Sequence, residues 1–496
     1  MKRHEGPRMI THRIAQPLCL TRSNIVAIRI VVLTIGLLAV IAAAPGALLA
    51  AAQERADSTL RIGWAEADIT PEGPVHLTGL GATVRITDAV KDPLKATVLA
   101  LESVAPDRPG CVVMVSLDLL SASECIRDGV REHLRQELAE LPTESVFFFA
   151  THTHTAPFHY TRPRYQPDFE QTEEPWIWRR HNDEAFQRAR EAMPPLTCRQ
   201  YVSFAARRIA DAVKTAWTGR TAGGIAFGLG HAVVGRNRLI VDRNGEGRMY
   251  GRTDTPGFSH IQGYEDHSVQ FLATYLPDGT LSGLVANLAC PAQAETSGRQ
   301  VSADFWHETR SELRRRFGDG LFILPQVSAA GDQDTNEPFD RLAERRMARL
   351  AGRTAREEIA FRIADAADRV LPLIQSEIDW SPVFAHRVEI LELPRREPQP
   401  DNPDLPIEVH ALRLGGVGMV TSPFELFLDY GIRIKGRSPA VQTFVVQLAG
   451  PGSYLPSARA MESGGYGATS GSREVGPEGG EKLVEWSVTT LNALWQ

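Results

Sequence analysis

Apolar runs and amphipathic stretches alternate along the chain in an order typical of an α/β protein. The run CVVMVSLDLL at 111–120 is continuous, which predicts a buried strand. The stretch 121–138 has helical spacing and begins with Ser121 and Glu124 at capping-box spacing. The run SVFFFA at 145–150 predicts a second strand. Strand, helix and strand in this order predict a right-handed βαβ unit with parallel strands.

Further elements follow from the same patterns. Asn244-Gly245 and Asp278-Gly279 lie between β-rich runs and predict two hairpins. Helical spacing predicts helices at about 201–217, 303–317 and 338–375, and the stretch 410–436 predicts a strand, a turn and a helix. No internal repeat and no linker interrupts 57–496, so we expect one domain there. The predicted fold class is α/β, a mixed multi-layer sandwich with βαβ units.

The N-terminal segment differs in composition from the rest. Basic residues from Lys2 to Arg29 precede an apolar stretch from Ile30 to about Ala52 that ends in small residues. A basic region, an apolar region and a small-residue end are typical of a secretory signal. We therefore expect 1–52 to be a signal peptide or a membrane anchor, with cleavage favoured. The mature protein would be periplasmic or extracellular, or anchored through its N-terminus.

Charge and cysteine content exclude some classes of protein. The 496-residue chain carries a formal net charge of −6, which argues against nucleic acid as a partner. None of the 5 cysteines forms a C-x-x-C pair, so the sequence predicts no zinc knuckle. An exported chain can form disulfides, but their pairing does not follow from the sequence.

The most informative polar residues follow the strand at 145–150. His152 and His154 are one residue apart, so both imidazoles would lie on one face of an extended chain. They lie at the carboxyl end of a predicted parallel strand, where open α/β sheets bind ligands. Asp118 ends the neighbouring strand at the same edge. Spacing alone leaves two interpretations open, half of a metal site or a hydrogen-bonded strand end.

Three metal-enzyme motifs are excluded. HETRS at 307–311 has Ser311 where the zincin motif needs histidine. The metallo-β-lactamase pattern needs aspartate and histidine where Ala156 and Pro157 stand. An amidohydrolase barrel would need eight βα repeats, which are not apparent.

Six short motifs resemble, in order, the neutral (non-lysosomal) ceramidase family. They are RIGWAEADITP, THTHTAP, NLAC…VSADF, AAGDQDTN, VTSPFEL and GSYLPSARAMESGGYG…VGPEGGEKLVE, spread from residue 61 to the C-terminus. The chain resembles the catalytic domain without the C-terminal immunoglobulin-like module. The resemblance implies a catalytic zinc held by two histidines, a glutamate and a tyrosine. It also implies a serine nucleophile and hydrolysis of the N-acyl bond of ceramide.

When the family's motifs are matched to this sequence residue by residue, the resemblance implies a metal site. It makes His152 the first histidine ligand and His154 a neighbour that contacts substrate or orients the site. It makes Glu425 of TSPFEL and Tyr454 of SYLPS the oxygen ligands. Zinc accepts nitrogen and oxygen ligands, and a catalytic zinc keeps one position open for water.

Two departures from the family pattern change the expected chemistry. The segment after VANLAC contains no second histidine, which leaves Cys290, Gln293 or Glu295 as a replacement ligand. An ordinary buried cysteine is the alternative for Cys290. Asp334 stands where the family has its serine nucleophile, in Gly-Asp-Gln-Asp-Thr-Asn.

We therefore expect an exported, metal-dependent hydrolase with one zinc ion. It would cleave an N-acyl amide or ester of a lipid-like substrate with metal-activated water, and Asp334 would act as general base. The expected partners are this small-molecule or lipid-like substrate and a membrane surface, with no nucleic acid. One alternative is a degenerate, non-catalytic relative that binds a lipid or glycan at the cell envelope. Another is a membrane-anchored structural protein of the envelope.

Overall fold

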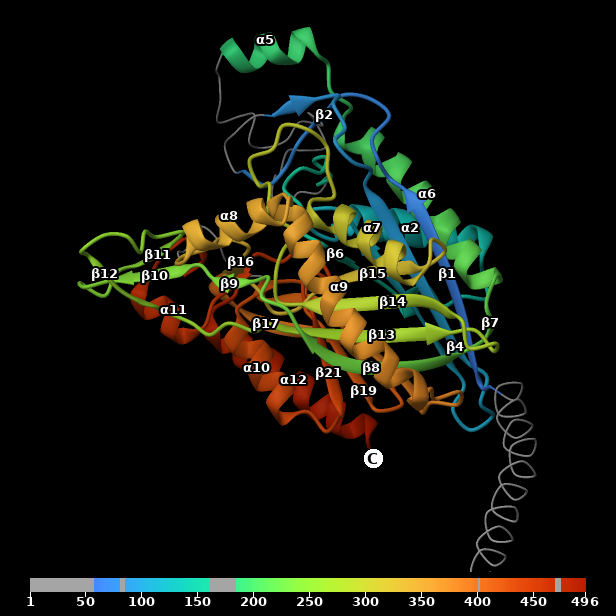
Figure 1. Cartoon of the computed structure of the whole chain (residues 1–496). Coiled ribbons are helices and arrows are strands. Elements are labelled where there is room, and N and C mark those ends of the chain that lie inside the picture. The colour runs from blue at the N-terminus through green and yellow to red at the C-terminus, as the bar shows by residue number, and fades with distance from the viewer. Residues whose placement is uncertain (1–57, 81–84, 161–183, 400–401, 469–473) are drawn as a thin grey trace, which may run out of the picture. The chain divides into compact units, whose positions relative to one another are not determined.

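The computed structural model describes residues 58–80, 85–160, 184–399, 402–468 and 474–496. These belong to one compact unit, Arg55–Gln496, whose three largest sheets have helices outside them (Figure 1). The segment 1–52, for which we expect an export function, lies outside the described residues.

The first sheet contains the predicted βαβ unit. Its strand order is β6-β5-β4-β1-β7, and β5 and β6 are parallel, as expected. Helices α2 and α6 cover one face, where apolar residues of the sheet and both helices form a core. The elements are β1 (Leu60–Asp68), β4 (Lys95–Ser103), β5 (Gly110–Leu117), α2 (Glu124–Glu137), β6 (Val146–Ala150), α6 (Cys198–Thr218) and β7 (Thr221–Ala222).

The second sheet carries one of the predicted hairpins. Its order is β15-β14-β13-β8, with β13 and β14 antiparallel around Asp278-Gly279 and β15 parallel to β14. Helices α7 and α9 pack on one face of it. The bounds are β8 (Gly224–His231), β13 (Ser268–Tyr275), β14 (Leu281–Leu288), α7 (Phe305–Phe317), β15 (Phe322–Val327) and α9 (Ala355–Ile374).

The third sheet lies near the C-terminus and has the order β17-β18-β19-β21. Apolar residues of helices α10 and α12 pack against this sheet and form a core with it. The bounds are β17 (Phe384–Gln399), β18 (Asn402–Leu414), β19 (Val417–Thr421), α10 (Leu428–Arg437), β21 (Gln442–Val446) and α12 (Pro477–Leu494). The inner faces of the three sheets meet in a common apolar core that includes Met114, Leu324 and Met419. This arrangement confirms the expected multi-layer α/β fold.

Short strands and helices complete the fold around the sheet edges. The predicted hairpin around Asn244-Gly245 is present as β10 and β11. The remaining elements are β2 (Val75–His76), β3 (Ile86–Thr87), α5 (Glu184–Ala192), β9 (Arg236–Asn237), β10 (Leu239–Asp242), β11 (Gly247–Met249), β12 (Phe258–Ile261), β16 (Gln333–Asp334), α8 (Arg341–Leu350), β20 (Glu425–Leu426), β22 (Tyr454–Leu455) and α11 (Ala458–Ser463). One-turn 3₁₀ segments lie at Thr143–Ser145, Gln375–Glu377 and Tyr466–Ala468.

Two local predictions were wrong. The cap of α2 is Ser123, which accepts from the Ile126 amide, and not Ser121. The expected single helix at 338–375 is two helices, α8 and α9. Gly352 at φ 67° lies between them, and Thr354 forms a capping box that starts α9. A left-handed glycine ends a helix and a capping box begins one, so the chain changes direction here.

In the part of the chain that the structure describes, no helix combines the length and the apolar run required to cross a bilayer. The four cysteines in that part, Cys111, Cys125, Cys198 and Cys290, are all free thiols.

Candidate functional site

The site begins where β6 ends. Two residues after Ala150, His152 adopts a left-handed backbone at φ 69°. Its amide donates to the Leu119 carbonyl at 3.0 Å, so the chain after β5 holds this strained turn. The Nδ1–H of His152 donates to the Leu120 carbonyl at 2.6 Å. The ring is therefore fixed with Nε2 directed toward Glu425.

Glu425 and Tyr454 reach the same place from the C-terminal part of the chain. They are direct partners in the parallel ladder between β20 and β22. Glu425 Oε2 lies 3.3 Å from His152 Nε2. Burial would raise the pKa of Glu425, but His152, Arg238 and the Tyr454 hydroxyl together lower it. The Glu425 carboxylate, whose side chain is 14% exposed, is thus charged and lies next to the imidazole.

Arg238 is the buried cation of the site, with a side chain that is only 1 % exposed. Nη2 donates to the Tyr454 hydroxyl at 3.3 Å and lies 3.9 Å from Glu425 Oε2. Nη1 donates to Tyr250, to Gln293 Oε1 at 3.1 Å and to Asp334 Oδ2 at 3.3 Å. Burial disfavours the charged guanidinium, but the phenol and carboxylate oxygens around it raise the pKa of Arg238. The site is therefore a compact set of opposite charges.

The orientation of His154 follows from these contacts. Because Gln293 Oε1 accepts from Arg238, the Gln293 amide nitrogen donates to His154 Nε2, 2.7 Å away. The imidazole proton of His154 then lies on Nδ1. Burial, and then the proximity of His152 and Arg238, lowers the pKa of His154 well below its ordinary value. His154 is a neutral side chain, and Arg85 fixes its backbone by donating to its carbonyl at 2.7 Å.

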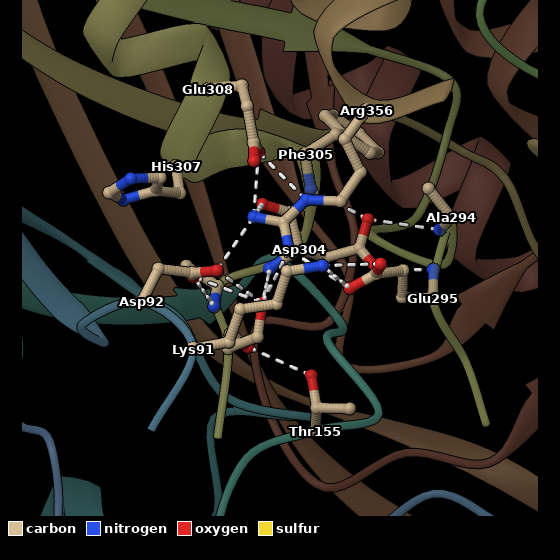
Figure 2. A network of polar contacts seen from close by, with 12 residues as sticks. Lys91, Asp92, Thr155, Ala294, Glu295, Asp304, Phe305, His307, Glu308 and Arg356 are labelled. Atoms are coloured by element: carbon tan, nitrogen blue, oxygen red, sulfur yellow. Dashed lines mark hydrogen bonds and ion pairs between the residues drawn. The ribbon is translucent and has the colours of Figure 1, made fainter. Parts of the chain in front are cut away.

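The segment that carries Gln293 is held by a buried ion network around Arg356 (Figure 2). Arg356 contacts Asp92 at 2.8 Å, Glu308 at 2.7 Å and Glu295 at 3.0 Å. Asp304, at φ 54°, accepts from the backbone amides of Ala294, Glu295 and Phe305. The network joins the starts of α7 and α9 to this segment, so it fixes the position of Gln293.

His152, His154, Glu425 and Tyr454 line one cavity of about 570 Å³. One part of its wall is apolar and the other part carries the polar groups described above. The apolar part is formed by Leu77, Leu80, Leu120, Phe158 and Met249. Such a combination is typical of a site that orients an apolar molecule by a few polar contacts.

Two residues singled out in the sequence lie elsewhere. Asp334 does not line this cavity; it lies behind Arg238 and lines a second, neighbouring cavity. The Cys290 thiol is fully buried, donates to the Pro291 carbonyl at 3.4 Å and lines neither cavity. Burial raises the pKa of Cys290 well above its ordinary value, which disfavours the thiolate that a metal requires.

The donor atoms around His152 match a zinc site only in part. Among the described residues, no three His, Cys, Asp or Glu side chains are placed to hold a metal. His152 and Glu425 provide two donors, and the Tyr454 phenol beside them provides a third. Three protein ligands and one open position suit a catalytic zinc, and the Nδ1 contact of His152 is typical of a ligand histidine. The charge of Arg238 next to Glu425 opposes a second cation, so weak binding is expected.

Three residues of the site were not singled out as functional from the sequence: Arg238, Tyr250 and Tyr466. One signal was available for Arg238. It directly precedes the buried strand LIVD in a segment, GRNR, with two arginines, and a cation next to a buried strand requires partners. Tyr250 lies in a turn and Tyr466 in a one-turn 3₁₀ segment, both too short for periodicity to indicate the direction of a side chain.

Fold and site together define an α/β protein with a polar site at a sheet edge. No protein-family model matches the sequence, and no curated protein does. The fold is that of the neutral ceramidases. The structure is similar to one described as a ceramidase complexed with C2, at TM-score 0.68 and 15% identity, covering 88% of this chain and 76% of that chain. It is also similar to the neutral ceramidase from Pseudomonas aeruginosa, at TM-score 0.64 and 15% identity, over 88% and 75% of the two chains.

Proposed function

We propose that the chain is an exported, metal-dependent hydrolase that cleaves the N-acyl amide or ester bond of a lipid-like substrate, in association with a membrane surface. The observation that carries the proposal is the approach of His152 Nε2 to Glu425 Oε2 at 3.3 Å. Two lone-pair-bearing atoms fixed this closely are stabilised by a shared cation or proton. The apolar wall of the cavity and the ceramidase fold support a lipid-like substrate.

Zinc would be held by His152, Glu425 and Tyr454. When bound, it would polarise the acyl carbonyl and activate water. Arg238, directed at Tyr454, would stabilise negative charge that develops on the carbonyl oxygen. His154 is neutral and would orient the substrate. Leu77, Leu120 and Phe158 would exclude water from the acyl chain.

Asp334 would accept a proton through Tyr250. Tyr250 lines the cavity, and its hydroxyl and Asp334 both accept hydrogen bonds from Arg238 Nη1, so it would connect the buried carboxylate with the substrate. Such a relay keeps Asp334 in the role of general base although it does not touch the cavity itself.

The test measures turnover of fluorogenic N-acyl amides and esters together with elemental analysis of the purified mature chain. We expect hydrolysis that depends on zinc and is abolished in Glu425→Gln. A matched control, His260→Gln, changes an exposed histidine that lines neither cavity, and it should retain activity. Affinity for acyl lipids without any turnover would overturn the proposal and identify a non-catalytic binding protein.

Export is tested separately. N-terminal sequencing of the protein from the periplasm or medium should give a chain that begins near Gln53. A full-length product confined to the cytoplasm would contradict the export function.

A further inference from the structure

A second cavity of about 800 Å³ adjoins the candidate site. Tyr250 and Thr296 line both cavities, so the two spaces meet at these residues. Asp334 lines the second cavity, and α8 with the start of α9 forms its outer wall. Tyr250 is 48% exposed, so it lies at the surface where the two spaces meet.

The second cavity is rich in arginine, although the chain as a whole carries a formal net charge of −6. Its lining contains six arginines and four acidic residues. The arginines are Arg236, Arg341, Arg345, Arg349, Arg353 and Arg362, and the acids are Asp334, Glu337, Glu344 and Glu358. A concave surface with excess positive charge attracts anions.

Half of these charges are paired with one another within the wall. Glu344 bridges Arg236 and Arg362, and Glu358 bridges Arg353 and Arg362. Burial raises the pKa of Glu344, but the two arginines around it outweigh this and lower it. The Glu344 bridge attaches α8 to β9 and α9, so the helix has a defined orientation.

Arg341 pairs with Asp254 outside the wall, and two further arginines remain. Within the part of the chain that the structure describes, Arg345 and Arg349 form no ion pair, and both are exposed. They are four residues apart on α8, so their side chains lie on one face of the helix. That face lines the cavity. Two adjacent guanidinium groups can bind one carboxylate or phosphate by charge-assisted hydrogen bonds.

We infer that the arginine-lined cavity binds an anionic group on the amine side of the substrate, which makes the substrate an N-acyl amine with a carboxylate or phosphate. This inference rests on the proposed function, because it assumes that the acyl chain occupies the apolar cavity. The scissile bond would then lie near Tyr250 and Arg238, and the amine side would extend past Tyr250 toward Arg345 and Arg349.

The experiment compares three amides with the same acyl chain, whose amine parts are neutral, carboxylate-bearing or phosphate-bearing. The wild type should hydrolyse at least one anionic amide with a kcat/KM about 10- to 100-fold above the neutral one. The R345Q/R349Q double variant should lose that preference and keep its rate on the neutral amide. The control is R346Q, since Arg346 is an exposed arginine of α8 that does not line the cavity. It should behave like the wild type.

An equal kcat/KM for neutral and anionic amides in the wild type would overturn the inference, as would a preference that R345Q/R349Q retains. If neither these amides nor the corresponding esters are hydrolysed, the proposed function fails. Calorimetric titration with inorganic phosphate then tests the cavity by itself. Binding by the wild type and R346Q but not by R345Q/R349Q supports the anion site alone. No binding, or equal binding by all three proteins, overturns it. Binding should weaken as the salt concentration rises.

Discussion

Arg238 donates to Asp334 at 3.3 Å, and the two side chains are only 1% and 4% exposed. Asp334 is the residue that the motif resemblance aligns with the serine nucleophile of the ceramidase family, and the structure places it in a buried ion pair. The pair places Arg238 between the two cavities and directs its other nitrogen at Tyr454. Asp334 thus contributes to the position of the cation as well as to any proton transfer.

Asp334→Asn should destabilise the protein and stop turnover. Removal of one partner from a buried ion pair leaves an uncompensated charge, and we expect the free energy of unfolding to fall by about 3 kcal/mol. Urea unfolding measures this change. Glu485→Gln, at an exposed ion pair with Arg437, serves as the control and should leave the unfolding midpoint unchanged.

The activity of the same variant separates the roles of Asp334. A base that acts through Tyr250 predicts loss of turnover without a trapped acyl-enzyme. A site that has lost its function predicts no turnover in the wild type and a trace in Asp334→Ser. Full activity in Asp334→Asn would contradict every catalytic role of this residue.

His152→Ala and Glu425→Ala should each lower the amount of zinc bound per chain. Each change removes one of three donors, and binding by two donors is much weaker. Elemental analysis after dialysis against a defined zinc concentration measures the effect. Cys290→Ser should bind as much zinc as the wild type, because the Cys290 thiol lines neither cavity. Loss of zinc in Cys290→Ser with retention in the other two would reverse the assignment.

Arg356→Met should loosen the segment that carries Gln293. The side chain of Arg356 is 3% exposed, so its loss leaves buried carboxylates such as Asp92 unpaired, at a cost of about 3–5 kcal/mol. Hydrogen exchange should accelerate at the amides of Ala294 and Glu295, which donate to Asp304. Arg315→Met, at an exposed ion pair with Glu312, should alter neither quantity. Unchanged exchange in Arg356→Met would show that Asp304 alone fixes the segment.

Stability should fall in acid partly through His386. Burial, followed by the proximity of His410, lowers the pKa of His386 to about 3. Because the folded-state pKa lies below the unfolded value of about 6.5, the unfolded chain gains a proton first as the pH falls. Stability is therefore full above about pH 6.5 and decreases from there toward pH 3.

His386→Gln should make this decrease less steep. With glutamine at this position, the unfolded and folded states differ by one bound proton fewer. The slope of the unfolding free energy against pH then falls by up to about 1.4 kcal/mol per pH unit. The glutamine amide can still donate to His410, as His386 Nε2 does at 3.1 Å. Urea unfolding between pH 4 and 7 measures the slope, and His260→Gln is the exposed control. An identical slope in His386→Gln and the wild type would show that His386 does not remain neutral.

The order of elements could be predicted because it depends on local patterns. The parallel pair β5 and β6 followed from two apolar runs around one helix, which placed His152 at a strand end. The break between α8 and α9 was missed although Gly352 and Thr354 mark it, because the amphipathic pattern continues across them. Periodicity therefore identified the elements better than their ends.

The candidate site could be predicted only in part. Motif order singled out Glu425 and Tyr454, which the structure brings together with His152. The pairing of Arg238 with Asp334 joins residues 96 positions apart through the short strands β9 and β16, and no local pattern specifies such a contact. The position of Cys290 outside the cavity likewise depends on tertiary packing.

The left-handed backbone of His152 affects how substitutions at this position change the stability of the protein. A residue with a Cβ is strained there by roughly 1–2 kcal/mol, and glycine would relieve that strain. The same substitution would delete a buried imidazole that hydrogen-bonds the Leu120 carbonyl and lies beside Glu425. The imidazole therefore offsets, through its own contacts, the backbone strain that its position imposes.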